Sequence, residues 1–199
     1  MSKIVLTDLT KSFGANHVLD GVTLSIEPGE SMTIIGQSGS GKSVMIKCIM
    51  GLIQPDGGSI RIDGEEVAGL RGQGMDPVRA QNRVQLQGGA AFFSLPIWLN
   101  VTFALTQGRG IAAREMRMIA EENLERVGLD RKILDLKPSE LSGGMQKRVA
   151  LARAIAAKPE IIFFDEPTTG LDPIRADVIN DLIQNLTNDL GMTALTITH

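Results

Sequence analysis

One eight-residue segment, residues 36–43, constrains the fold of this chain more than any other feature. The segment reads GQSGSGKS, and it follows a short β-branched stretch, SMTII, and precedes an apolar stretch, VMIKCIMGLI. It matches the pattern G-x-x-x-x-G-K-[ST] in the strand–loop–helix setting that gives this pattern its meaning. The sequence therefore predicts a loop that binds the phosphates of a nucleoside triphosphate.

The residue types of this loop suit phosphate chemistry. Glycines let the backbone wrap closely around phosphate oxygens and direct N–H groups inward. Lys42 supplies a cation for the β- and γ-phosphates, Ser43 supplies a hydroxyl for Mg²⁺, and the helix that follows adds its positive dipole end. The residues predicted to contact the nucleotide are Gly36, Gln37, Ser38, Gly39, Ser40, Gly41, Lys42 and Ser43.

Strand and helix patterns alternate along the chain. Short apolar stretches bounded by Gly, Pro, Asp or Asn predict strands at 31–35, 59–62, 161–164 and 193–198. Apolar residues with helical spacing predict a helix after Asp172, for which Gly191 is a suitable terminating residue. Helical patterns also dominate residues 101–158, which we interpret as a helical insertion. Strand–helix–strand alternation predicts an α/β fold with a mostly parallel sheet.

Composition excludes several classes of protein. A chain of 199 residues is long enough for one well-packed domain, and its net charge of −3 argues against nucleic-acid binding. The single cysteine, Cys48, rules out an internal disulfide framework. The N-terminus is too polar for a signal peptide, and no apolar stretch reaches the roughly 18 residues of a membrane span. We expect a cytosolic domain, soluble alone, that meets a membrane only through a partner.

Two adjacent carboxylates, Asp165 and Glu166, end the apolar stretch IIFF. In open α/β sheets, ligands bind at the carboxyl ends of the strands. One carboxylate there can hold Mg²⁺, and the next can orient and deprotonate a water that attacks the γ-phosphate. By itself this pair is as compatible with simple strand capping as with catalysis.

Upstream of the carboxylates stands ELSGGMQKRVALARAIAAKP. Ser142 is a suitable helix N-cap, and the two glycines after it expose N–H groups at a helix N-terminus, which favours an anion; the alternative is a plain helix cap. With LSGGM in the place of the LSGGQ motif, the whole chain resembles the ATP-binding subunit of an ABC transporter. The resemblance implies a single ABC-type P-loop domain over 1–199, with N-terminal antiparallel strands and a helical subdomain at about 101–158.

The resemblance also implies roles for individual residues. Ser142, Gly143 and Gly144 would clamp the γ-phosphate of ATP held by a second copy in a head-to-tail dimer. Glu166 would be the base, and Mg²⁺ would meet Ser43, Asp165 and Gln87. Gln87 would also position the water and face the membrane partner. Phe13 would stack on adenine, although a lone Phe is more often a core residue. Asp172 would contact the second copy, and His199 would contact the γ-phosphate.

Three stretches are similar to Mla-type ATPases: QGGAAFFSLPIWLNV, LSGGMQKRVALARAI and DEPTTGLDPIRADVINDLI. This likeness implies ATP hydrolysis that powers phospholipid transport across the Gram-negative cell envelope. The implied partners are a multi-spanning permease, a small cytosolic regulatory subunit and a periplasmic lipid-binding subunit. The implied location is the cytoplasmic face of the inner membrane.

The chain departs from the family pattern near the expected permease contact. Leu86 replaces the usual aromatic residue, and Phe93 and Leu99 stand where acidic residues are usual. Two interpretations are open for a set of four apolar residues: they make an apolar docking patch, or they are ordinary buried loop residues. The set consists of Phe93, Leu95, Trp98 and Leu99. The chain also ends at His199, where such domains normally continue, so we expect a truncated form with an uncovered sheet edge and low stability.

Two other functions compete with transport. The first is a non-transport ABC ATPase in DNA repair or translation; the short insertion and the acidic balance argue against it. The second is a non-hydrolysing module that binds ATP as a sensor. Glu166 and His199 argue against the sensor, whereas the altered loop at Gln87 and the early end of the chain favour it.

Overall fold

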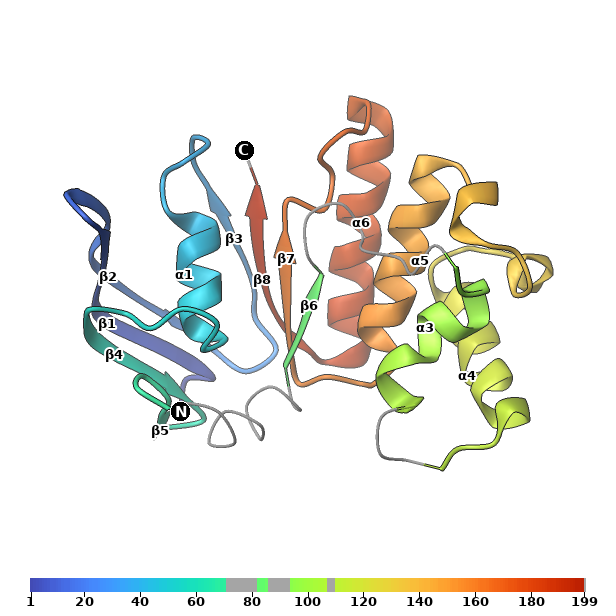
Figure 1. The fold of residues 1–199 in the computed structure, drawn as a ribbon, viewed down its shortest axis with the longest axis horizontal. Helices are drawn as coiled ribbons and strands as arrows, with labels where there is room; N and C mark the ends of the chain where they lie inside the picture. Colours follow the sequence, from blue (N-terminus) through green and yellow to red (C-terminus); the bar gives the residue numbers. More distant parts are fainter. Residues whose placement is uncertain (71–81, 86–93, 107–109, 199) are drawn as a thin grey trace. The chain divides into compact units, whose positions relative to one another are not determined.

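The computed structural model describes residues 1–70, 82–85, 94–106 and 110–198, and within them the chain forms two four-stranded sheets and a set of helices (Figure 1). The chain divides into two compact units. The first comprises Met1–Arg83, Glu160–Asp165 and Gly191–His199, and the second comprises Val84–Pro159 and Glu166–Leu190. Mixed helices and sheets confirm the predicted α/β class.

An antiparallel sheet in the first unit has the strand order β2-β1-β4-β5. Its strands are β1 (Ile4–Phe13), β2 (Asn16–Ile26), β4 (Gly57–Ile62) and β5 (Glu65–Glu66). Ile4 of β1 lies opposite Ile26 of β2 on one side and Ile62 of β4 on the other, and alternate residues such as Leu6 are fully buried. The stretch predicted as a strand at 59–62 therefore belongs to this antiparallel sheet.

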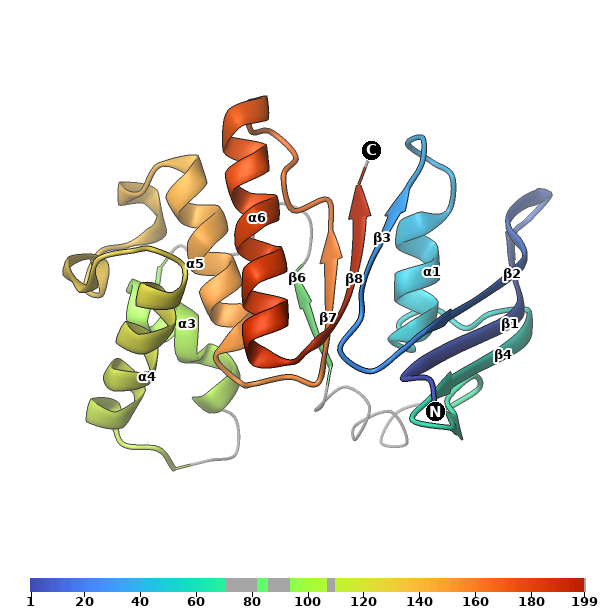
Figure 2. The same cartoon turned by 180° about the vertical axis from the view of Figure 1, so that it is seen from behind.

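The second sheet has the order β3-β8-β7-β6, and its first three strands are visible side by side in Figure 2. The strands are β3 (Ser31–Ile35), β8 (Thr193–Thr198), β7 (Ile161–Asp165) and β6 (Asn82–Gln85). β8 pairs in parallel with both β3 and β7. All five residues of β7 are buried, which fits the continuous apolar sequence typical of parallel strands. Strands predicted from the apolar stretches at 31–35, 161–164 and 193–198 are confirmed.

One helix of the first unit, α1 (Lys42–Ile49), starts directly after the predicted phosphate loop. Its apolar face is buried through Met45, Ile46 and Ile49. The helix has no side-chain N-cap, since the residue at that position is Gly41. The amide groups of its first turn therefore lack a capping side chain, which suits a helix start that meets an anion.

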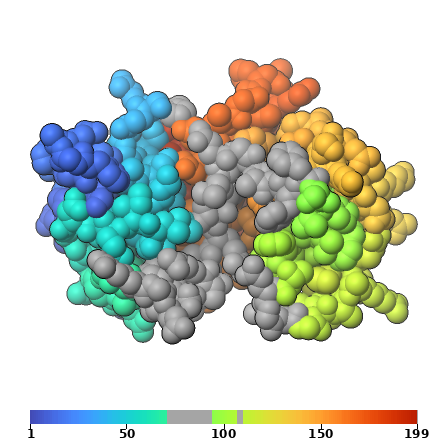
Figure 3. All heavy atoms as spheres, in the orientation of Figure 1, coloured from blue at the N-terminus to red at the C-terminus, as the bar shows by residue number. Residues whose placement is uncertain are grey.

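The second unit is helical in the part that the structure describes. Its helices are α3 (Ile97–Thr106), α4 (Ala113–Arg126), α5 (Gly143–Ile155) and α6 (Pro173–Leu190), with short 3-10 turns at Arg131–Ile133 and Pro138–Glu140. Val101, Leu124 and Leu151 are fully buried in its core. Figure 3 shows the green, yellow and orange atoms of these helices gathered in one region.

The first of these helices begins at Ile97, four residues before the start predicted for the helical insertion. The predicted organisation into one domain with a helical subdomain at about 101–158 stays a prediction. Among the helices in the described ranges, none has both the length and the apolar character needed to cross a membrane.

Candidate nucleotide site

The loop predicted to bind phosphate connects β3 to α1 within the first unit. The amide N–H of Gly36 donates a hydrogen bond to the carbonyl oxygen of Thr198 at 3.4 Å, which ties the start of the loop to β8. Gly39 and Gly41 have φ angles of +79° and +89°, in the left-handed region that side chains disfavour. The loop therefore uses two of its glycines for conformations that other residues adopt only with strain.

Gly41 is also required by its surroundings. A Cβ atom at this position would lie 2.5 Å from the carbonyl oxygen of Val18 in β2, far inside van der Waals contact. At Gly39 an added Cβ would meet nothing within 4 Å. The antiparallel sheet thus closes against the loop at Gly41, whereas Gly39 is constrained by its backbone angle alone.

Lys42 lies at the centre of the loop and is only 9% exposed. Its Nζ donates hydrogen bonds to the carbonyl oxygens of Gly36 at 2.5 Å and Gln37 at 2.9 Å, and to Ser40 Oγ at 3.4 Å. A buried ammonium held by three oxygens of its own loop is a cation fixed in position. This arrangement suits the neutralisation of phosphate charge.

Ser43 and Asp165 come together although 122 residues separate them in the sequence. The hydroxyl of Ser43 donates a hydrogen bond to Asp165 Oδ1 at 2.9 Å, and Asp165 is 8% exposed at the end of β7. A hydroxyl and one carboxylate are hard oxygen donors, and Mg²⁺ in nucleotide sites is typically held by one or two protein oxygens together with phosphates. The described residues contain no group of three or more His, Cys, Asp or Glu side chains that could hold a metal ion.

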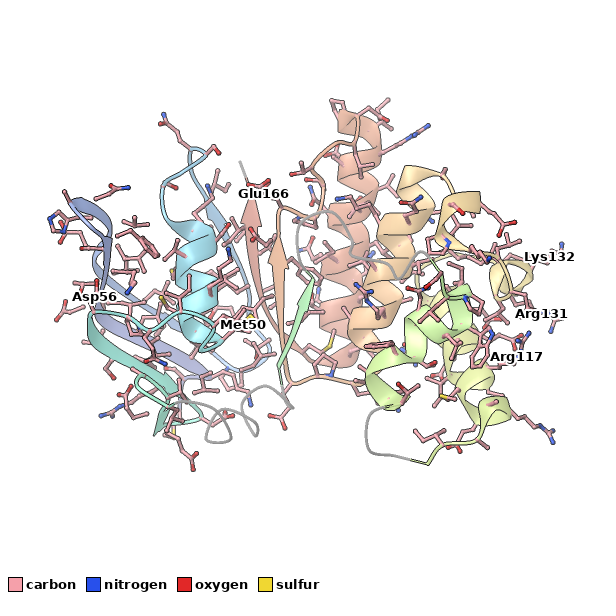
Figure 4. All side chains as sticks on the ribbon, in the orientation of Figure 1. Met50, Asp56, Arg117, Arg131, Lys132 and Glu166 are labelled. Carbon is pink, nitrogen blue, oxygen red and sulfur yellow. The ribbon has the colours of Figure 1, made fainter. Side chains whose placement is uncertain are left out.

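Glu166 follows directly after β7 (Figure 4) and belongs to the second unit. Its φ angle is +51°, which is uncommon for a residue with a side chain. The hydroxyl of Thr169 donates a hydrogen bond to Glu166 Oε2 at 2.9 Å. Burial lowers the pKa of the Lys147 ammonium, and the Glu166 carboxylate opposes that change. The predicted base is therefore set in a strained turn beside a hydroxyl donor and a partly buried cation.

The LSGGM stretch begins α5 as predicted. The hydroxyl of Ser142 caps the helix by accepting a hydrogen bond from the Met145 amide at 3.4 Å. Added Cβ atoms at Gly143 and Gly144 would meet nothing within 4 Å, and neither residue has a positive φ angle. Within the part of the chain that the structure describes, the packing therefore does not require glycine at these two positions. The start of α5 therefore has open space beside both glycines.

A cavity of about 310 Å³ adjoins this helix start. It lies between the first turns of α5 and the first half of α6, and Ser142, Met145, Ile174 and Val178 are among its lining residues. Ile174 is 77% exposed and Val178 is 43% exposed. Gly144 also lines the cavity, which therefore connects this glycine to an exposed apolar surface.

Asp172 and Phe13 have local partners. Asp172 accepts a hydrogen bond from the Arg175 amide at 3.1 Å, and its carboxylate lies 3.1 Å from Arg175 Nε, so it caps the start of α6. Phe13 is 49% exposed at the end of β1, and Lys11 Nζ lies 5.4 Å from the centre of its ring. Such exposure differs from that of a core residue. The predicted dimer contact of Asp172 and the predicted adenine stacking of Phe13 stay predictions.

Some predicted residues lie outside the described part of the chain. They are Gln87, His199, Leu86 and Phe93. The described members of the possible docking patch, Leu95, Trp98 and Leu99, are all half-buried. This intermediate exposure leaves both interpretations of the patch open.

Sequence reasoning missed two arrangements. The first is the pairing of Thr169 with Glu166, for which the three-residue spacing in a turn was the available signal. The second is Arg117, whose guanidinium lies 5.4 Å from the centre of the Trp98 ring and forms hydrogen bonds to both carboxylate oxygens of Asp135, at 2.7 and 2.6 Å. Figure 4 marks Arg117 on the helical unit. Only the packing of α3 and α4 reveals this second arrangement.

Comparison with known proteins identifies the family. The family model described as "ABC transporter" matches residues 19–169. The probable ribonucleotide transport ATP-binding protein mkl of Mycobacterium leprae is 40% identical over 198 residues, which cover 98% of this chain and 56% of that protein. The methionine import ATP-binding protein MetN of Rhizobium etli is 40% identical, with 98% and 53% coverage.

The intermembrane phospholipid transport system ATP-binding protein MlaF of Haemophilus influenzae is 38% identical, with 98% and 74% coverage. This chain thus spans about half the length of the first curated relatives. Among solved structures, the dimeric post-hydrolysis state of the ATP-binding cassette MJ0796 bound to ADP and Pi superposes with a TM-score of 0.87 at 33% identity, covering 98% of this chain and 88% of that one. The family match and these relatives together show that this chain belongs to the ABC transporter family and contains its ATP-binding domain.

Proposed function

We propose that this protein binds and hydrolyses ATP to power an ABC transporter. The observation that carries the proposal is the hydrogen bond between Ser43 and Asp165 beside the fixed cation Lys42. It places a hydroxyl, a carboxylate and an ammonium at one phosphate loop, and such groups hold the phosphates and the metal ion in phosphoryl transfer from ATP. The match to the ATP-binding cassette bound to ADP and Pi supports the same chemistry.

Each residue of the loop has a distinct task in this proposal. The backbone N–H groups of residues 36–43 hold the phosphates, and Lys42 neutralises charge that develops on the γ-phosphate. Ser43, Asp165 and Gln87 would hold Mg²⁺, which when bound supplies further positive charge to the β- and γ-phosphates. Phe13 would stack on the adenine ring.

Hydrolysis requires a base and a positioned water. Glu166 would accept a proton from the attacking water, while Gln87 and His199 would orient the water and the γ-phosphate. Ser142, Gly143 and Gly144 would approach the γ-phosphate bound to a second copy, because the N–H groups of a helix start favour an anion and the space beside both glycines is open. ATP would thereby close a head-to-tail dimer, and hydrolysis would open it, which moves a membrane permease.

For the transported substrate we propose phospholipid. The stretches around LSGGM and residues 165–183 resemble Mla-type ATPases, and the relative MlaF is named for intermembrane phospholipid transport. The relatives named for ribonucleotide and methionine transport are as similar in sequence, so a lipid assay has to decide between the three. The proposed partners are a multi-spanning permease, a small cytosolic regulatory subunit and a periplasmic lipid-binding subunit. The proposed location is the cytoplasmic face of the inner membrane.

The substitution Glu166→Gln tests the ATPase proposal. Without the carboxylate, no base accepts the proton of the attacking water, so we expect ATP turnover to fall about 100-fold or more. ATP binding, measured by equilibrium dialysis with Mg²⁺, stays within about threefold because the phosphate loop is unchanged. Glu125→Gln, at an exposed position of α4, is the matched control and keeps normal turnover. Near-normal hydrolysis by Glu166→Gln would refute the role of Glu166.

A further inference from the structure

In the turn after β7, one residue, Thr169, donates two hydrogen bonds to Glu166. The amide N–H of Thr169 donates a hydrogen bond to the carbonyl oxygen of Glu166 at 3.2 Å, which closes the turn. The hydroxyl of the same threonine donates to Glu166 Oε2 at 2.9 Å. Thr169 thereby fixes both the backbone and the side chain of the proposed base.

This double contact explains how the unusual backbone of Glu166 is maintained. A φ angle of +51° is unfavourable for a residue with a Cβ atom, and such conformations persist only where the surroundings over-determine them. The backbone hydrogen bond from Thr169 is one such determinant. Strained residues of this kind cluster at active sites, where the strain orients a functional group.

The side-chain contact determines the direction of the carboxylate. A glutamate has three rotatable side-chain bonds, and a hydrogen bond to Oε2 removes most of that freedom. With Oε2 held by Thr169, fewer directions are open to Oε1. Threonine suits this task because its β-branch restricts χ1, so its hydroxyl is itself held in place.

We propose that Thr169 is a positioning residue that aligns the Glu166 carboxylate for proton transfer from the attacking water. The inference rests on the proposed role of Glu166 as base and goes beyond it by naming the group that orients that base. Lys147 adds a positive charge close to the same carboxylate, since the Glu166 carboxylate favours the charged form of the Lys147 ammonium. Within the second unit, therefore, a hydroxyl donor and a cation both act on the one carboxylate.

The substitution Thr169→Val tests the positioning role, because it keeps the shape and the β-branch but removes the hydroxyl. Small displacements of a catalytic group are costly, so we expect kcat for ATP hydrolysis to fall about tenfold or more. The KM for ATP stays within about twofold, since Thr169 has no part in nucleotide binding. Thr169→Ser restores the hydroxyl and returns kcat to within about threefold of the original protein.

Two controls separate positioning from loss of structure. Thr106→Val removes a threonine hydroxyl that donates to the Phe103 carbonyl oxygen in α3, and it leaves kcat unchanged. Single-turnover hydrolysis in the Glu166→Gln background is the second control. There, adding Thr169→Val lowers the residual rate by less than about twofold, because the base that Thr169 positions is already absent.

The possible results are distinguishable. If Thr169→Ser is as slow as Thr169→Val, or if Thr169→Val has normal kcat while Glu166→Gln is inactive, the positioning role is wrong and the ATPase proposal stands. If Glu166→Gln hydrolyses ATP normally, both proposals fail together. Thermal unfolding and ATP binding of each variant are measured in parallel. A Thr169→Val protein that does not fold leaves the Thr169→Ser result to decide, since the positioning role requires that variant to retain its kcat.

Discussion

At the scale of single residues, the phosphate loop has two glycines with positive φ angles. They differ in what a larger residue would meet at each position. Gly39 avoids only the strain of a positive φ angle, because an added Cβ would meet open space. Gly41 avoids that strain and also a collision with the backbone of Val18. Both residues are glycines, and only the packing of β2 beside Gly41 distinguishes the two positions.

This pair yields a prediction of stability. Gly39→Ala costs about 1–2 kcal/mol of unfolding free energy, from backbone strain alone. Gly41→Ala costs at least about 1 kcal/mol more, because the new methyl group forces β2 or the loop to move. Urea unfolding without nucleotide measures both values, and each variant is the other's control. Equal losses of stability would show that the loop relaxes away from Val18 at no cost.

At the scale of an element, the first turn of α5 has a structural role and a proposed functional one. Ser142 caps the helix, so the turn is formed without help from any partner. Glycine in a helix is less stable than alanine by roughly 0.5–1 kcal/mol, because it loses more conformational freedom on folding. Two adjacent glycines at Gly143 and Gly144 therefore weaken a helix that has space for side chains at both positions.

Stability and function should consequently change in opposite directions at this helix. Gly143→Ala and Gly144→Ala each raise the unfolding free energy by about 0.5–1 kcal/mol. If the glycines admit the γ-phosphate of a second copy, both variants also reduce ATP-dependent dimerisation, measured by light scattering in the Glu166→Gln background. Gly110→Ala, also with open space and no positive φ, is the control that leaves dimerisation unchanged. Stabilised variants that still dimerise normally would show that this face meets no nucleotide.

At the scale of the whole molecule, the chain has two units with different chemistry. The first contains the phosphate loop, Lys42 and the paired Ser43 and Asp165. The second contains Glu166, the start of α5 and the half-buried residues of α3. Residues with proposed roles in one reaction thus come from both units.

The proposed transporter predicts which molecules accompany the protein from a cell. The tagged protein, purified from native membranes solubilised in detergent, should retain a multi-spanning permease together with bound phospholipid, both identified by mass spectrometry. The same purification from membranes without the tagged protein is the control. Recovery of the permease with a nucleotide or methionine and no lipid would overturn the substrate proposal and leave the transporter intact. Recovery of soluble nucleic-acid machinery alone would contradict both.

Much of the site was predictable because its parts are continuous in the sequence. The loop from Gly36 to Ser43, the strand that precedes it and the helix that follows depend on neighbours a few residues apart, where spacing and residue type are informative. The same holds for Ser142 as the cap of α5, which the structure confirms. The role of Ser59–Ile62 was less predictable, since its pattern indicates a strand but not which sheet it joins.

Sequence alone thus determined the strand–loop–helix pattern around residues 36–43, the strands β7 and β8, the helix after Asp172 and the family to which the chain belongs. Tertiary structure decided which distant groups meet: Ser43 with Asp165, Gly41 with Val18, and Trp98 with Arg117. It also showed the left-handed backbone of Glu166, which residue type alone does not indicate. The reason is physical: local propensities act over a few residues, whereas contacts across the chain form only when packed strands and helices bring separate segments together.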